Sequence, residues 1–178
     1  MTRRGSAVAA LVFALFATGC VAAPPAPGPT PAPAADDAPG APSSPAEVAW
    51  RTEMIASINA QRANAGVSPL GLCGTLNDAA QAHSADQAAH STMSHTGSNG
   101  SGVSERITAS GYTGWNGWGE NVAVGYRSVA SVMAGWMSSP GHRANILSAT
   151  YDHVGLGLAT STGGTPYWTQ DFGRGGHC

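Results

Sequence analysis

The stretch from residue 136 to 147, WMSSPGHRANIL, constrains the fold of this chain more than any other. Five apolar residues lead into the start of this stretch at helical spacing: Val129, Val132, Met133, Trp136 and Met137. This i, i+3, i+4, i+7, i+8 pattern predicts an amphipathic helix with one buried face. Proline cannot donate to the helical ladder and glycine favours turn angles, so we expect the helix to stop at Pro140 and Gly141. His142 would then lie at the surface, just past a helix end.

Three more helices are predicted upstream of this one. Ser44 and Glu47 form a capping box around a proline, and the helix that they open is expected to run to about Asn64. A second, alanine-rich helix is expected from Thr75 to about His90. A third, short helix is expected over Val103–Ala109.

The C-terminal part alternates as strands do. Residues 152–160 and 167–172 are expected to be strands, and the Gly-rich residues 162–165 between them predict a hairpin. Residues 121–124 fit either a short strand or an irregular connector. Helices first and a hairpin last predict an α+β fold, with helices packed on a sheet.

The N-terminus is typical of an export signal, assigned to residues 1–20. Arg3 and Arg4 precede an apolar run at 7–16, which is too short to span a bilayer, and small residues then lead to Cys20. This resembles a bacterial lipoprotein signal in which Cys20 is acylated, so that the protein is held on the outer side of the cell membrane. The alternative is ordinary cleavage near Ala23, which would leave a secreted protein.

Residues 21–44 are rich in proline and alanine and have almost no large apolar side chain to bury. Such a segment cannot offset the entropy cost of ordering, so we interpret it as a disordered tether. The folded domain is therefore assigned to residues 45–178.

Export places the domain in an oxidising compartment, where paired cysteines form disulfides. Cys73 and Cys178 are the two cysteines that remain after Cys20, and we predict that they are bonded to each other. On the chain-entropy model a loop of this length stabilises by about 4–5 kcal/mol. The alternative is two free thiols.

All eight basic residues are arginines, and Arg3 and Arg4 belong to the leader. The exported chain would therefore carry six arginines against ten acidic residues, a net charge of −4. This balance argues against nucleic acid as a partner and against binding to anionic lipid surfaces. We expect contact with a membrane only through the N-terminal lipid anchor.

Three polar residues stand in segments dominated by glycine and aromatic residues: His95, Glu120 and His142. Two imidazoles and a carboxylate suit an open divalent-metal site or general acid–base chemistry. Their spacing alone does not show that they converge. No HExxH, CxxC, GxSxG or Walker motif is present to indicate another mechanism.

Four blocks, in this order, resemble the CAP superfamily of cysteine-rich secretory, antigen 5 and pathogenesis-related 1 (SCP-like) proteins: HSADQAAHSTMSHTGSNG, GENVAVGY, GWMSSPGHRANILSATYDHVGLGLA and YWTQDFG. The resemblance is to the bacterial branch. It implies a three-layer α-β-α sandwich with a central antiparallel sheet. It also implies a cleft with two histidines and two acids, of which His95, Glu120 and His142 are present. The second acid is missing, since Met137 to Pro140 after Trp136 contain none.

The resemblance implies a binding module for small apolar ligands, such as sterols or fatty acids, or for protein partners, including envelope proteins. His95, Glu120 and His142 would bind the ligand, and His95 and His142 could hold zinc. One alternative is a metal-assisted hydrolase or peptidase that uses the same three residues as catalytic candidates. Another is a structural envelope protein, whose cleft residues only stabilise loops.

Overall fold

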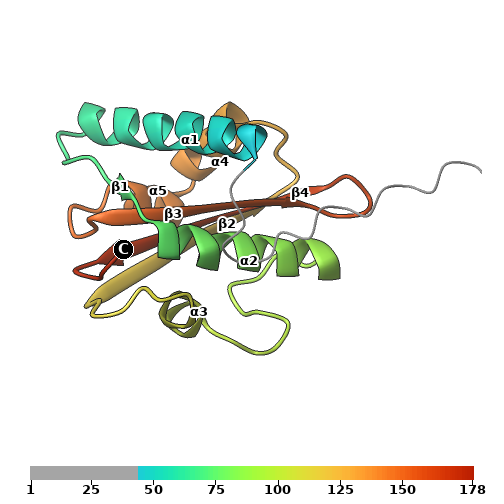
Figure 1. Ribbon diagram of the computed structural model, residues 1–178. Helices are drawn as coiled ribbons and strands as arrows, with labels where there is room; N and C mark the ends of the chain where they lie inside the picture. Colours follow the sequence, from blue (N-terminus) through green and yellow to red (C-terminus); the bar gives the residue numbers. More distant parts are fainter. Residues whose placement is uncertain (1–43) are drawn as a thin grey trace, which may run out of the picture. The chain divides into compact units, whose positions relative to one another are not determined.

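The computed structural model describes residues 44–178 (Figure 1). The predicted signal, the acylation of Cys20 and almost all of the tether lie outside these residues. The elements in chain order are α1 Pro45–Asn64, β1 Gly71–Leu72, α2 Gly74–His90, α3 Val103–Ala109, β2 Gly117–Val124, α4 Val129–Ser138, α5 Pro140–Ile146, β3 His153–Thr160 and β4 Pro166–Arg174. Within the described part, no helix combines the length and hydropathy needed to cross a membrane.

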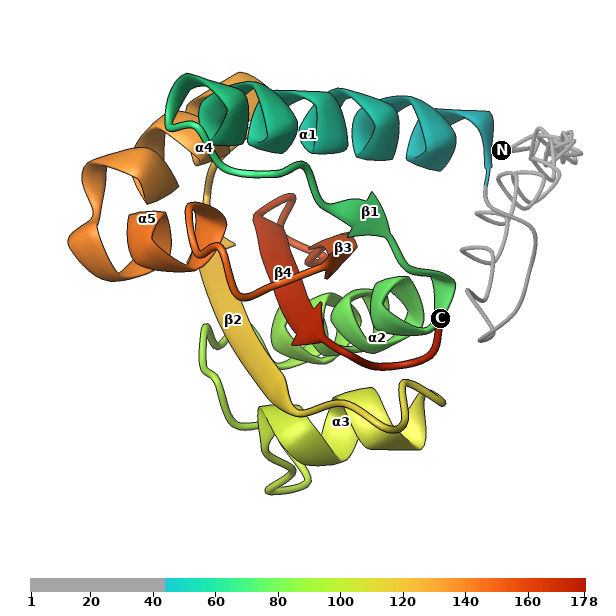
Figure 2. The ribbon, with the colours of Figure 1, turned by 90° about the vertical axis from the view of Figure 1, so that its left-hand side faces the viewer.

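The elements form an α-β-α sandwich, as predicted. The sheet has the order β1-β3-β4-β2. Helices α1, α4 and α5 cover one face, and α2 and α3 cover the other (Figures 1 and 2). The three long strands are antiparallel, but β1 runs parallel to β3, so the sheet is mixed rather than antiparallel. With two residues and both exposed, β1 has no alternation from which the sequence could reveal it.

Helix α2 packs very closely on the sheet because two glycines of β3 face it. A Cβ atom at Gly155 would overlap the backbone of Leu76, and one at Gly157 would overlap the backbone of Ala80. The buried alanines of α2 complete this close approach. The GLG spacing in β3 therefore sets the distance between two layers of the sandwich.

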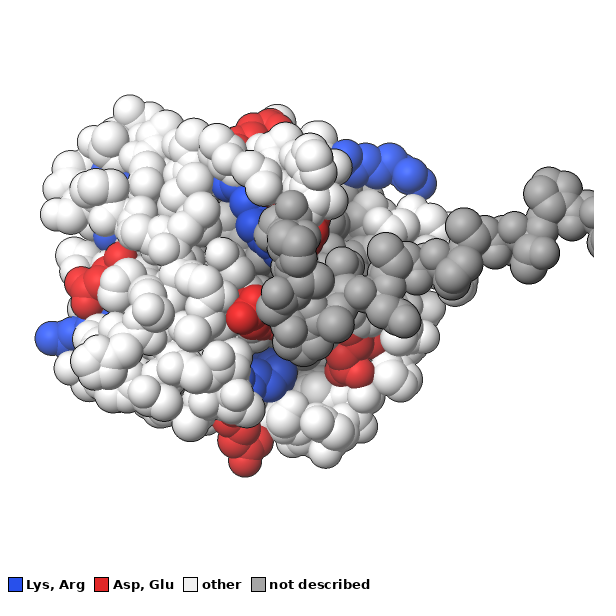
Figure 3. Space-filling model, in the orientation of Figure 1, with Lys and Arg blue, Asp and Glu red and all other residues white. Residues whose placement is uncertain are grey.

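Charged side chains are sparse on the face of the molecule that Figure 3 shows. Acidic and basic groups of the described residues are scattered there among uncharged neighbours and are not gathered by sign. Binding to nucleic acid depends on a concentrated basic surface. This face shows no such basic surface among the described residues.

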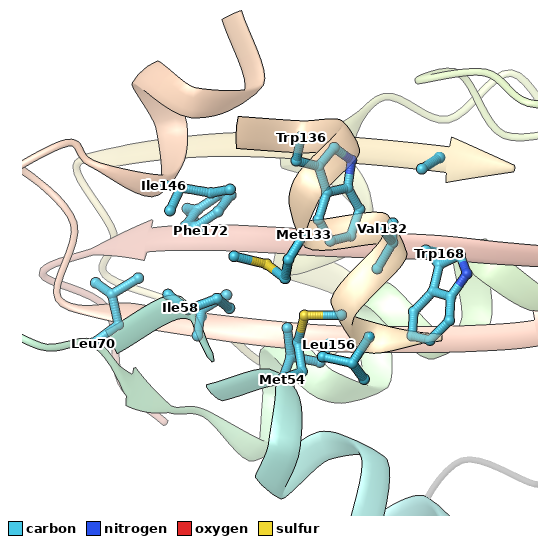
Figure 4. Packing of buried hydrophobic residues seen from close by; sticks show 13 residues of the cluster. Met54, Ile58, Leu70, Val132, Met133, Trp136, Ile146, Leu156, Trp168 and Phe172 are labelled. Carbon is cyan, nitrogen blue, oxygen red and sulfur yellow. The ribbon is translucent and has the colours of Figure 1, made fainter. Parts of the chain in front are cut away.

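The main core lies between the sheet and the layer of α1 and α4 (Figure 4). It contains the predicted apolar face of α4 and the inward side chains of α1, β3 and β4: Met54, Ile58, Val132, Met133, Trp136, Leu156, Trp168 and Phe172. Ser128 caps α4 by accepting a hydrogen bond from the backbone of Ser131 (3.2 Å). The periodicity from which we predicted α4 thus corresponds to the face that the core buries.

The chain does not leave helical structure after Pro140, contrary to expectation. Helix α4 ends at Ser138, but Pro140 is the first residue of a new helix, α5. Proline suits this position because the first turn of a helix needs no backbone N–H donor. His142 therefore lies in the first turn of α5 and not in a loop past a helix end.

The disulfide prediction is confirmed, since Cys73 and Cys178 are bonded with their Cα atoms 5.2 Å apart. Cys73 is the N-cap of α2. The bond therefore attaches the C-terminus to the start of α2.

Candidate functional site

The centre of the site is Glu120 on β2, the edge strand of the sheet. Its side chain is 1% exposed, and both carboxylate oxygens are engaged. Oε1 accepts a hydrogen bond from His95 Nδ1 (2.7 Å), and Oε2 accepts one from Arg106 Nη2 (2.6 Å). A buried carboxylate held by two charge-assisted bonds is a rigid support and not a free group.

Strand β2 is fixed along its outer edge by side chains of the α4–α5 region. Alternate carbonyls accept hydrogen bonds as follows: Trp118 from Tyr151 Oη (3.0 Å), Glu120 from Asn145 Nδ2 (3.1 Å) and Val122 from Trp136 Nε1 (3.3 Å). These bonds protect the edge from pairing with another strand. They also fix the backbone from which the Glu120 side chain projects.

His95 lies in the loop after α2, and its side chain is 59% exposed. Because Nδ1 donates to Glu120, Nε2 of the neutral ring keeps a lone pair that can bind a ligand. Arg106 Nη1 holds the same loop by donating to the carbonyls of His95 (3.1 Å) and Ser101 (2.9 Å). Arg106 thus fixes both the carboxylate and the loop that carries the histidine.

His142 approaches from α5, which lies beside β2 (Figure 2). Its carbonyl accepts a hydrogen bond from Asn121 Nδ2 (3.1 Å), and Asn145 in turn donates to Asn121 Oδ1 (2.9 Å). Burial lowers the pKa of His142, and protonation of His95 would lower it further. The neutral form of His142 is therefore favoured at neutral pH.

Asp171 is a second buried acid that sequence reasoning did not find. It lies opposite Glu120 in the β2–β4 ladder and is 0% exposed. Burial holds the pKa of Asp171 well above its usual range, and the charge of Glu120 raises it further. The acid that the family has after Trp136 is absent. The carboxyl group of Asp171 on β4 instead comes from the position paired with Glu120 on β2. The alternation of Thr169 and Asp171 in TQDFG could have placed Asp171 on the face of Thr169, which contacts α2.

His83 of α2 lies behind Glu120, with its Nε2 3.8 Å from Oε2. The histidine is buried, and Nε2 donates to the carbonyl of Ser94 (2.8 Å). Burial lowers the pKa of His83, since desolvation outweighs the attraction of Glu120. His90, on the same helix, is exposed and lies outside the site.

These contacts decide how the site could hold zinc. Both oxygens of Glu120 are occupied, so this residue orients His95 rather than ligating a metal, as carboxylates behind metal-binding histidines commonly do. His95 Nε2 and the His142 ring remain as donors. Among residues 44–178, no group of three or more His, Cys, Asp or Glu is arranged to hold a metal ion. His95 and His142 are therefore the candidate ligands for zinc.

The sequence model of the CAP family, described as the cysteine-rich secretory protein family, matches residues 55–172. This chain belongs to the CAP family. The matched region begins in α1 and ends in β4, so it covers the sheet, the helices on both of its faces and all the residues of the site.

Two proteins of Bacillus subtilis are similar to this CAP protein. The uncharacterized protein YkwD is 31% identical over 131 residues, which are 73% of this chain and 49% of YkwD. The uncharacterized membrane protein YlbC is 28% identical over 120 residues, 67% of this chain and 33% of YlbC. The chain thus spans half or less of the length of either relative.

Solved structures agree on the fold. An outer surface protein of Borrelia burgdorferi superposes with a TM-score of 0.66 at 21% identity, over 71% of this chain and 92% of that one. An extracellular protein of Bacillus anthracis that contains an SCP domain gives 0.62 at 23% identity, over 75% and 45% of the two chains. At such identities the likeness shows the CAP fold alone.

Proposed function

We propose that this CAP protein is an extracellular binding module, whose site around His95, Glu120 and His142 takes a small ligand with an apolar part or the surface of a protein partner. One observation carries the proposal. Glu120 is buried with both oxygens engaged, and its hydrogen bond to Nδ1 holds the exposed ring of His95 in place. This arrangement supports binding by fixed imidazoles.

The same observation argues against hydrolysis with Glu120 as the general base. A general base must reach the proton that it removes. Glu120 is already bound on both oxygens, and Asp171 is fully buried. Neither carboxyl group of the described site is free to accept a proton from a water molecule in the cleft.

Exposed apolar side chains next to the two site segments support an apolar ligand. Met93, two residues before His95, is 49% exposed, and Trp118, two residues before Glu120, is 42% exposed. Burying such side chains contributes about 25 cal/mol per Å² of apolar surface. A sterol, a fatty acid or an apolar patch of an envelope protein could use them.

Zinc is the ion that we propose for His95 and His142. When bound, it would supply a Lewis acid that attracts an oxygen of the ligand. His95 would bind through Nε2 while Glu120 holds its Nδ1 proton, and His142 would bind through its neutral ring. A fatty acid would fit both parts of this site. Its carboxylate would bind the ion, and its acyl chain would pack on Met93 and Trp118.

The location outside the cell is supported by the disulfide, which persists in oxidising compartments. The export signal at residues 1–20, the lipid anchor at Cys20 and the tether up to residue 44 are part of this proposal. Mass spectrometry of the mature N-terminus tests them. An unacylated N-terminus beyond Cys20 would leave a secreted protein.

Calorimetric titration with zinc tests the site, using His95→Ala and His142→Ala. His90→Ala is the matched control, because His90 is 58% exposed and His95 is 59% exposed. We expect one zinc per chain, lost in both site variants and kept in the control. If all four proteins bind zinc alike, the proposed zinc site is wrong.

The alternative functions are tested with the same variants. Hydrolysis of a peptide or ester by the wild type, abolished in His142→Ala, would favour the hydrolase. Loss of stability alone in the site variants would favour the structural role.

A further inference from the structure

Three consecutive residues of the inner strand β4, Thr169, Gln170 and Asp171, are polar and fully buried or nearly so. Pairing with β2 sets Gln170 opposite Asn121. Asp171 follows opposite Glu120, the centre of the proposed site. Residues of these types are mostly exposed in proteins, because burying a polar group costs free energy unless hydrogen bonds compensate it. The bonds of this triplet therefore indicate its role.

Thr169 connects β4 to the loop of His95 on the α2 side of the sheet. Its Oγ1 accepts hydrogen bonds from Ser84 Oγ (2.9 Å) and Gln87 Nε2 (3.2 Å). The oxygen of the same Gln87 amide accepts a hydrogen bond from the backbone N–H of Ser94 (3.2 Å), the residue before His95. Because Thr169 and Gln87 are both buried, these bonds are protected from competition with water.

Gln170 connects β4 to helix α5 on the opposite side of the sheet. Its Oε1 accepts a hydrogen bond from Asn121 Nδ2 (3.0 Å), and the same nitrogen donates to the carbonyl of His142 (3.1 Å). Within residues 44–178, the partners of Gln170 Nε2 are the sulfur atoms of Met54 and Met133, both at 3.8 Å. Sulfur is a weak acceptor, so an apolar side chain would suit this part of the core better. The bond to Asn121 is what a glutamine adds here.

Successive side chains of a strand point to opposite faces, so neighbouring residues of β4 reach the two histidines from two sides of the sheet. We propose that Thr169 and Gln170 are positioning residues for these histidines. Thr169 holds the loop of His95 through Gln87. Gln170 holds the first turn of α5, and with it His142, through the amide on β2. Their role rests on the function proposed for the site, because both are buried and would affect a ligand through the histidines.

NMR of the histidine rings in the ligand-free, disulfide-bonded protein tests the two connections separately. The ring signals of His95 and His142 are assigned from their loss in His95→Ala and His142→Ala. Thr169→Val keeps the shape of the side chain but removes the hydroxyl, and it should shift the signals of His95 while those of His142 stay. Gln170→Met should do the reverse. Shifts in neither variant, or equal shifts of both rings in both variants, would overturn the proposal.

Two further variants separate positioning from general loosening of the core. Thr169→Ser keeps the hydroxyl that accepts from Ser84 and Gln87, so its His95 signals should match those of the wild type. Ile58→Val removes one methylene group from the buried core without touching either connection, and both rings should keep their signals. If Ile58→Val shifts the rings as far as the other variants do, Thr169 and Gln170 have only a structural role and the proposal fails.

Zinc titration of the same variants separates this proposal from the function proposed for the site. Groups that orient metal-binding histidines change metal affinity by about 10–100-fold. If the wild type binds zinc, Thr169→Val and Gln170→Met should each weaken binding about tenfold, and unchanged affinity in both would overturn the positioning role. If the wild type binds no zinc, the proposed zinc site is wrong, while the ring signals still decide whether Thr169 and Gln170 position the histidines.

Discussion

Arg106→Met tests the electrostatic support of the site. The substitution keeps much of the packing of the long side chain but removes the guanidinium that donates to Glu120 Oε2 and to the carbonyls of His95 and Ser101. Glu120, with its side chain 1% exposed, would then be a buried charge with His95 as its remaining close partner. The loop that carries His95 would also lose two bonds.

The expected loss of stability in Arg106→Met follows from the burial of Glu120. Breaking a buried ion pair by removing one partner costs about 3–5 kcal/mol, because the other charge stays behind without compensation. An exposed pair would cost about 0–1 kcal/mol. Since domains of this kind have a free energy of unfolding of about 5–15 kcal/mol, the variant should still fold, but with a much smaller free energy of unfolding.

Urea unfolding, followed by tryptophan fluorescence, measures the effect. Arg143→Met is the control, since Arg143 is exposed, and should change the free energy of unfolding by less than about 0.5 kcal/mol. Adding Glu120→Gln to Arg106→Met should recover part of the loss, because the orphaned charge disappears. A loss of less than about 1 kcal/mol in Arg106→Met, or no recovery in the double variant, would refute the account of a buried ion pair.

Three further predictions concern the rest of the fold. Gly157→Ala places a Cβ atom against the α2 backbone and should lower the free energy of unfolding by more than about 3 kcal/mol, the upper end for ordinary overpacking. Gly163→Ala is the control in the same urea experiment and should be near neutral, because its loop has room for the Cβ atom. Reducing Cys73–Cys178 should lower the free energy of unfolding by about 4–5 kcal/mol, and an unchanged urea midpoint in reductant would contradict this. Asp171→Asn should stabilise the protein at neutral pH, because the native state keeps a proton that the unfolded chain releases above its pKa of about 3.9. That advantage should shrink as the pH falls towards about 4, and a pH-independent difference between variant and wild type would count against the raised pKa.

Much of the fold could be predicted from the sequence because its signals are local. The capping box at Ser44, the apolar face of α4 and the alternation of β3 and β4 each reflect the geometry of one element. Residues 121–124 fitted either a short strand or a connector, and they form the second half of β2, which begins at Gly117. Its glycine-rich start has no alternation, and hydrogen bonds from Tyr151 and β4 hold it as a strand.

The candidate site was predicted only in outline, since its contacts are long-range. His95, Glu120 and His142 were singled out from their sequence context, and only the family resemblance implied that they converge. The structure bonds Glu120 to His95, and Asn145 of α5, the helix of His142, donates to the Glu120 carbonyl. Arg106 and Asp171 were missed. No local pattern relates a short helix or the last strand to Glu120, and only the folded sheet brings them together.

X-ray absorption at the zinc edge of the zinc-loaded protein tests the central claim most directly. The account predicts two imidazole nitrogens at about 2.0–2.1 Å from the ion, with oxygen atoms of water or ligand in the remaining positions. It also predicts that the spectrum of Glu120→Gln keeps the same number of ligands, because Glu120 supports His95 and does not bind the metal. A spectrum with fewer than two imidazoles, or one that loses an oxygen ligand in Glu120→Gln, would contradict the account.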